Sequence, residues 1–249
     1  MAFLDFHFHS ETLGKQVSAY VVLPQETSSS QIGIEGKQAA KKFPCLYLLH
    51  GLSDDHTIWL RRTSIERFAA TYGIAIVMPD GGKSFYTDEK HGLPYYTFVS
   101  EELPRVCESF FNISTDPGDR LIAGLSMGGY GALKIALKNP DRYRAVGALS
   151  PVSDIRQPYF PDVYRNVFGE SIPDDADLFI LASKTDSAAV KPAVFMGVGT
   201  SDFMYQDTLR LKAHFETLHY DFTYRESEGD HCWAFWDEYI QYVLEWMFQ

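Results

Sequence analysis

The chain has few cysteines and no long apolar run. Its three cysteines, Cys45, Cys107 and Cys232, show no Cys-x-x-Cys pair and no metal-finger spacing, so we expect reduced thiols rather than a disulfide framework or a zinc site. Cys45 and Cys107 fall in apolar patterns and are expected in the core. No apolar stretch approaches the roughly 20 residues of a membrane-spanning helix, so a membrane is not an expected partner.

Basic residues are also scarce. Lysine and arginine total 22 against 33 aspartates and glutamates, a formal net charge of -11. Such a chain repels phosphate backbones, so nucleic acid is not an expected partner either. The first ten residues have no basic start and no sustained apolar segment, which favours a cytoplasmic protein, although a secreted chain without its signal peptide would look the same.

The chain alternates expected strands and helices, and its length is ordinary for one domain. With 249 residues, 45% of them hydrophobic, we expect a single α/β domain over residues 1–249. The first two strands predict an antiparallel hairpin at a sheet edge, and the others a mostly parallel sheet with helices on both faces. The expected strands cover residues 3–9, 17–23, 43–49, 74–78, 121–123, 145–149, 193–198 and 221–226. The expected helices cover residues 58–72, 99–111, 127–137, about 176–183 and 205–218, and the chain ends in an aromatic-rich helix.

Two segments interrupt this alternation. Residues 24–42 are polar and rich in helix and strand breakers, so they predict an exposed loop. Residues 150–192 contain five prolines and only one expected short helix. A connection of that length in a compact α/β domain is typical of a lid or a substrate-shaping insert.

One motif organises the chain. Gly124-Leu125-Ser126-Met127-Gly128 lies between a buried strand and a helix, the setting in which Gly-x-Ser-x-Gly forms a nucleophile elbow. The five-residue pattern alone would occur by chance in roughly one chain in ten of this length. Its position in the strand–turn–helix context makes Ser126 the expected nucleophile.

A serine nucleophile needs a histidine base and an acid that orients it. His231 follows the last expected strand, and Asp202 follows the strand before it, which matches the chain order nucleophile, acid, histidine. Asp154 remains open as an alternative acid. The weaker candidates are Asp186, Asp207 and Asp230. The other histidines are expected at surface or structural positions: His7, His9, His56, His91, His214 and His219.

The oxyanion of an acyl-transfer reaction needs two hydrogen-bond donors, which in this architecture are backbone amides. Met127, directly after the nucleophile, supplies the first expected amide. Leu52, in the turn His50-Gly51-Leu52 after an expected central strand, supplies the second. His50 itself is expected to brace that turn.

Several motifs occur in order along the chain: His50-Gly51-Leu52, Pro79-Asp80-Gly81-Gly82, Glu101-Glu102-Leu103-Pro104, the elbow extended to Ala132, Asp202-Phe203 and His231-Cys232-Trp233. In these motifs, and over nearly its whole length, the chain resembles the esterase D branch of the α/β hydrolases, and most of all its bacterial tributyrin esterases. The resemblance implies the α/β-hydrolase fold and a serine carboxylesterase for short acyl esters, without cofactor or metal. It also implies the triad Ser126, Asp202 and His231 with the Leu52 and Met127 amides, and a Trp233 that borders the substrate, unless Trp233 only packs the last helix.

Other functions stay open at this point. A thioesterase of the S-formylglutathione hydrolase kind needs cations for two carboxylates, and the loops offer only scattered ones such as Arg61, Arg62 and Lys83. A feruloyl or acetyl-xylan esterase, or a non-catalytic binding protein on the same fold, are further alternatives. The aromatic-rich C-terminal helix would also permit a homo-oligomer.

Overall fold

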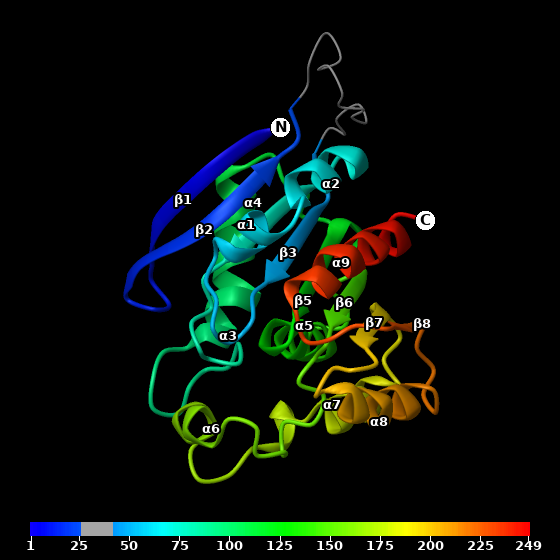
Figure 1. Ribbon diagram of the computed structural model, residues 1–249. Helices are drawn as coiled ribbons and strands as arrows, with labels where there is room; N and C mark the ends of the chain where they lie inside the picture. Colours follow the sequence, from blue (N-terminus) through cyan, green and yellow to red (C-terminus); the bar gives the residue numbers. More distant parts are fainter. Residues whose placement is uncertain (26–41) are drawn as a thin grey trace.

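A single eight-stranded sheet forms the centre of the protein (Figure 1). The computed structural model describes residues 1–25 and 42–249, so all but the ends of the loop predicted over 24–42 lies outside the described residues. The strand order is β1-β2-β4-β3-β5-β6-β7-β8. The strands are β1 (Ala2–Ser10), β2 (Lys15–Leu23), β3 (Cys45–Leu49), β4 (Ala75–Pro79), β5 (Arg120–Leu125), β6 (Ala145–Leu149), β7 (Ala193–Gly199) and β8 (Phe222–Ser227).

The predicted antiparallel hairpin is confirmed at the sheet edge. β1 pairs with β2 from Ala2↔Leu23 to Ser10↔Lys15, and β2 is also antiparallel to β4. From β4 to β8 all neighbouring strands are parallel. Strands β3, β4, β5 and β6 are buried along their whole length, as continuous apolar runs must be when helices cover both faces.

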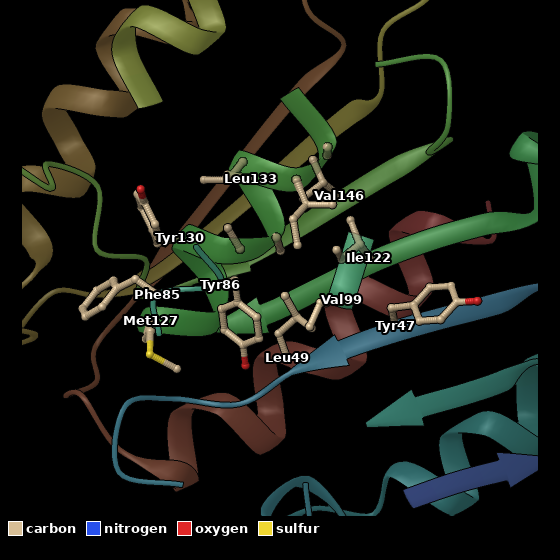
Figure 2. Close-up of a cluster of buried hydrophobic side chains, with 14 of the residues drawn as sticks. Tyr47, Leu49, Phe85, Tyr86, Val99, Ile122, Met127, Tyr130, Leu133 and Val146 are labelled. Atoms are coloured by element: carbon tan, nitrogen blue, oxygen red, sulfur yellow. The ribbon is translucent and has the colours of Figure 1, made fainter. Parts of the chain in front are cut away.

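Helices cover both faces of the sheet, as predicted. One face packs against α1 (Ile58–Arg62), α2 (Ile65–Tyr72) and α9 (Trp233–Met247). The opposite face packs against α4 (Leu103–Phe110), α5 (Met127–Lys138), α7 (Leu178–Thr185) and α8 (Tyr205–Phe215). Figure 2 shows part of this second core, where Leu49, Ile122 and Val146 from the strands face Leu133 of α5.

Two predicted helices differ in the structure. The helix expected over residues 58–72 is two helices, α1 and α2, separated at Thr63 and Ser64. The helix expected over residues 99–111 follows the short α3 (Tyr95–Thr97) and begins with a wide π-helical turn (Phe98–Glu102) before α4. Pro104 is the second residue of α4 and follows the π-helical turn directly, so its missing amide removes one intrahelical hydrogen bond at this junction.

The insert between β6 and β7 holds more helix than expected. Besides α7, which replaces the helix expected over about 176–183, it contains α6 (Pro161–Phe168) and a short 3-10 turn (Asp174–Ala176). Tyr164 and Phe168 of α6 pack against Phe85. None of the helices among the described residues is long and apolar enough to cross a membrane.

Candidate active site

Ser126 occupies a sharp turn between β5 and α5. Its φ of 53° lies in the left-handed region that non-glycine residues rarely adopt. The glycines on either side allow the turn, because a β-carbon on Gly124 would lie 2.5 Å from the Gly128 carbonyl, and one on Gly128 would lie 2.4 Å from the Leu49 oxygen. Ser126 is therefore held in the strained geometry of a nucleophile elbow.

The turn after β3 lies against this serine. A β-carbon on Gly51 would be only 3.9 Å from that of Ser126, so the Gly51–Leu52 peptide borders the nucleophile. Within residues 1–25 and 42–249, neither Leu52 nor Met127 donates its amide to a backbone carbonyl. Both predicted oxyanion donors are thus unpaired amides. Met127 is next to the serine in the chain, and Leu52 is next to it in space.

His50 braces the Leu52 turn. The amide of Gly81 donates to His50 Nε2 at 2.8 Å, so the ring proton is on Nδ1, which donates to the Gly51 carbonyl at 2.7 Å. Tyr86 fixes the same turn by donating its hydroxyl to the His50 carbonyl at 3.0 Å, and Figure 2 shows Tyr86 in one core with Met127. Carbonyl and amide of a trans peptide point in opposite directions, so holding the Gly51 carbonyl also orients the Leu52 amide.

Ser126, His231 and Asp202 form one hydrogen-bonded chain. His231 Nε2 lies 3.1 Å from Ser126 Oγ, and His231 Nδ1 lies 2.9 and 3.0 Å from the two oxygens of Asp202. A carboxylate can only accept, so Nδ1 carries the ring proton and Nε2 is free to accept from the serine. Asp202 is 4% exposed and also accepts from the Met204 amide at 2.8 Å.

Two aromatic side chains contact the imidazole of His231. The ring of Phe203 lies 4.5 Å from it, and the ring of Trp236 lies 4.9 Å from it at 89°. Phe203 is 54% exposed, so it offers an open aromatic surface beside the reacting atoms. Sequence reasoning assigned neither ring a role in the site, although Phe203 belongs to the Asp202-Phe203 motif.

The competing acids are engaged elsewhere. Asp154 accepts from Arg210 at 2.8 Å, Asp186 pairs with His219 and Lys191, and Asp230 accepts the His231 backbone amide. Asp207 lies in α8, as expected, where Arg210 and the hydroxyl of Tyr159 donate to it. None of these four carboxylates bonds to the His231 ring.

Two of the other histidines have hydrogen-bond partners outside the triad. His7 pairs with Asp5 and Ser18, and His214 bonds to Ser183 and the Phe179 carbonyl. Among the described residues, no three histidine, cysteine, aspartate or glutamate side chains gather as a metal site would need. The chemistry in view is that of a serine, a histidine and an aspartate.

Acidic side chains lie next to the Leu52 turn. Asp54 donates its amide to the Gly51 carbonyl at 3.3 Å, and its Oδ2 lies 3.1 Å from where a Gly51 β-carbon would be. Partial burial raises the pKa of Asp54 above its ordinary value. Asp55 follows it and is exposed, so this side of the site is unfavourable for anionic groups.

Fold and site together define a serine hydrolase of the α/β-hydrolase class. A family model described as "Putative esterase" matches residues 10–246, so the chain belongs to this esterase family. An acetyl esterase of Caldicellulosiruptor saccharolyticus is 31% identical over 99% of this chain and 98% of that enzyme. An S-formylglutathione hydrolase of Arabidopsis thaliana is 31% identical over 84% of this chain and 78% of that protein.

Solved structures agree with the predicted esterase resemblance. The fluorophosphonate-binding serine hydrolase FphF of Staphylococcus aureus has a TM-score of 0.89 and 29% identity, covering 100% of this chain and 98% of that one. The S-formylglutathione hydrolase FrmB of the same organism has a TM-score of 0.86 and 30% identity, covering 100% and 99%. The predictions of an α/β-hydrolase fold and of a serine esterase are confirmed at this level.

Proposed function

We propose that this protein is a carboxylesterase that cleaves short-chain acyl esters of uncharged alcohols through an acyl-enzyme on Ser126. The observation that carries the proposal is the continuous chain from Asp202 through His231 to Ser126, with the serine on a strained turn. Similarity to an acetyl esterase over nearly the whole length of both chains supports a short acyl group.

In the first half of the reaction Ser126 Oγ attacks the ester carbonyl while His231 Nε2 takes its proton. The amides of Leu52 and Met127 donate to the oxyanion that forms. The bond to the alcohol oxygen then breaks, and His231 returns the proton to the departing alcohol. Asp202 stays ionised throughout, stabilises the imidazolium and keeps the proton on Nδ1.

In the second half a water molecule attacks the acyl carbon. His231 takes a proton from this water, and the same two amides bind the second oxyanion. The Ser126 ester bond breaks, the serine oxygen recovers the proton from His231, and the carboxylic acid leaves. The cycle consumes one water and needs no further reactant.

The acidic residues beside the Leu52 turn favour uncharged leaving groups. A leaving group with carboxylates would meet Asp54 and Asp55 on that side of the serine, at a cost that salt would reduce. Arg61 and Arg62 lie at the exposed end of α1, and the Arg62 charge reaches Asp54, although water screens it there. The charges near the site therefore favour a neutral ester over a glutathione thioester.

S-formylglutathione hydrolysis is the second candidate, since a solved S-formylglutathione hydrolase is similar to this chain over its full length. Purified protein should be assayed on p-nitrophenyl esters from acetate to octanoate, methyl ferulate, acetylated xylan and S-formylglutathione, with Ser126→Ala as control. We expect acetate or butyrate esters to be preferred, and Ser126→Ala to lose all measurable turnover. A preference of several hundredfold for S-formylglutathione, about 3 to 4 kcal/mol, would overturn the substrate class and keep the serine mechanism.

A fluorophosphonate probe tests the serine independently of substrate. We expect the probe to label wild type and to leave Ser126→Ala unlabelled. A wild type without labelling and without turnover on every ester would instead identify a non-catalytic binding protein.

The same proposal covers the subfamily, the location, the domain organisation and the partners of the protein. We place the protein among tributyrin esterases, in the cytoplasm, as a single domain that does not bind nucleic acid and can self-associate.

Trp233 is half-buried and packs on Trp59 and Trp236 rather than on His231. Its contact with substrate stays a prediction, which a raised KM in Trp233→Ala would support and an unchanged KM would refute.

A further inference from the structure

Ser150, like Ser126, is a non-glycine residue with a positive φ. It follows β6, is fully buried, and has a φ of 44°. A non-glycine residue in this region is strained, and such strain persists only where the surroundings enforce it. Its own amide is held by the Gly197 carbonyl of β7 at 2.7 Å.

The chain on each side of Ser150 holds the peptide groups of Ser126. The Ser126 amide donates to the Leu149 carbonyl at 2.8 Å, and the Val152 amide donates to the Ser126 carbonyl at 3.3 Å. Both partners come from one short segment that turns at Ser150. The left-handed turn therefore lets this segment fix the nucleophile at two points.

The side chain of Ser150 points to the Trp236 ring beside His231. Its Oγ accepts a hydrogen bond from Trp236 Nε1 at 3.1 Å, and both side chains are buried. A buried indole N–H needs an acceptor, and the acceptor fixes the rotation of the ring. The fixed ring is the one that stands perpendicular to the His231 imidazole at 4.9 Å.

We propose that Ser150 is a positioning residue that couples the nucleophile to its base. Its backbone sets the peptide groups of Ser126, and its hydroxyl fixes the Trp236 ring against which His231 rests. Asp202 holds only the Nδ1 side of the imidazole, so the indole restrains the tilt that carries Nε2 toward or away from Ser126 Oγ. The inference rests on the roles proposed above for Ser126 and His231.

The test is a double-mutant cycle on kcat. Ser150→Ala removes the acceptor, Trp236→Phe removes the donor and keeps an aromatic ring, and the double variant removes both. We expect each single variant to lower kcat about tenfold with KM within about twofold, because a small misalignment affects reaction more than binding. The double variant should lose no more than the worse single one, because both changes break one interaction.

Two further variants separate positioning from stability. Ser150→Gly tolerates the positive φ but has no hydroxyl, so it should match Ser150→Ala in kcat while melting at a higher temperature. Thr185→Val is the matched control, because its buried hydroxyl donates to the Leu137 carbonyl, 11 residues along α5 from Ser126 or about 16 Å. It should lower the melting temperature and leave kcat unchanged.

Rates are expressed per site labelled by the fluorophosphonate, so that unfolded protein does not count. A Ser150→Ala enzyme with kcat per site within twofold of wild type would overturn the proposal, as would losses that add in the double variant. If Ser150→Ala does not fold, a Trp236→Phe enzyme with wild-type kcat overturns the proposal in its place. An inactive wild type would instead refute the proposed function, so the two failures are distinguishable.

Discussion

Asp202 differs from the other carboxylates near the site in what its oxygens contact. Both of its oxygens face His231 Nδ1, whereas Asp154 is paired with Arg210. Replacing Asp202 by Asn presents an amide to Nδ1 and favours the wrong tautomer of the histidine, with the ring proton on Nε2. We predict that Asp202→Asn lowers kcat by about 10³ to 10⁴.

Asp154→Asn is the matched control for this prediction, and it should keep kcat within about twofold because Asp154 does not contact the ring. Steady-state kinetics on p-nitrophenyl acetate compares the two. A larger loss in Asp154→Asn than in Asp202→Asn would reverse the assignment of the acid, which the sequence alone leaves open between these two residues.

His50 supports the proposed oxyanion site without being part of it. Its ring ties the Gly51 carbonyl to the Gly81 amide. His50→Ala removes both bonds and leaves the Gly51 carbonyl with the longer bond from the Asp54 amide, so the Leu52 peptide is held less firmly. We predict a loss of kcat of about 10- to 100-fold, which is smaller than the 10²- to 10³-fold loss typical of removing an oxyanion donor, because the Leu52 amide is displaced but not deleted.

His219→Ala serves as the histidine control, because this exposed residue bonds only to Asp186. It should keep wild-type kcat in the same assay. Wild-type kcat in His50→Ala would show that the Leu52 turn holds its shape without the imidazole.

At the residue scale, the sequence predicted the site residues that chain order and motifs define. It did not predict the contacts that depend on how distant side chains pack. Ser126, Asp202 and His231 were predicted because this fold orders nucleophile, acid and base along the chain, and the structure brings them within hydrogen-bond distance. The contact between Trp236 and Ser150 joins residues 86 positions apart, and no local pattern encodes it.

At the scale of elements, the β1–β2 hairpin is tied to the π-helical turn by one buried carboxylate. Glu102 accepts from the Ser10 hydroxyl and from the amides of Glu11 and Thr12. Burial alone would raise the pKa of Glu102, but these hydrogen bonds outweigh it and lower the pKa below its ordinary value. The ionised group therefore stabilises the fold above its ordinary pKa, and this stabilisation is lost as the pH falls through the native pKa.

We predict that Glu102→Gln lowers the free energy of unfolding by about 1 to 3 kcal/mol at neutral pH. The difference from wild type should shrink as the pH falls from the ordinary pKa of Glu102 through its lowered native pKa. Urea titrations over this range measure it, with the exposed neighbour in Glu101→Gln as control. A difference that stays constant down to the lowest pH would mean that the charge of Glu102 does not carry the stabilisation.

Strands were easier to predict than helices for a physical reason. A strand buried on both faces is a short apolar run between breakers, and β6 matches its predicted range of residues 145–149. Helix ends depend on distant partners: α1 and α2 separate where the Ser64 amide donates to Asp237 of α9, 173 residues away. Pro161 suggests a breaker in the sequence, yet it begins α6, because proline is favoured in a first turn.

At the scale of the whole molecule, the sheet separates two apolar cores. All four tryptophans, Trp59, Trp233, Trp236 and Trp246, lie on the face covered by α1, α2 and α9. The insert helices α6 and α7 pack into the opposite core. Tryptophan fluorescence therefore reports on one layer only, whereas calorimetry reports on both.

This separation gives a test of whether residues 1–249 form one domain. The strands of the sheet contribute side chains to both cores, as Leu48 and Leu49 do on consecutive positions of β3. Unfolding of one helix layer therefore also removes the packing of the other. We predict one unfolding transition, with a calorimetric enthalpy of about 170 kcal/mol near 60 °C that equals the van't Hoff enthalpy from tryptophan fluorescence. A calorimetric enthalpy well above the van't Hoff value, with an earlier transition silent in tryptophan fluorescence, would show instead that the insert layer unfolds by itself.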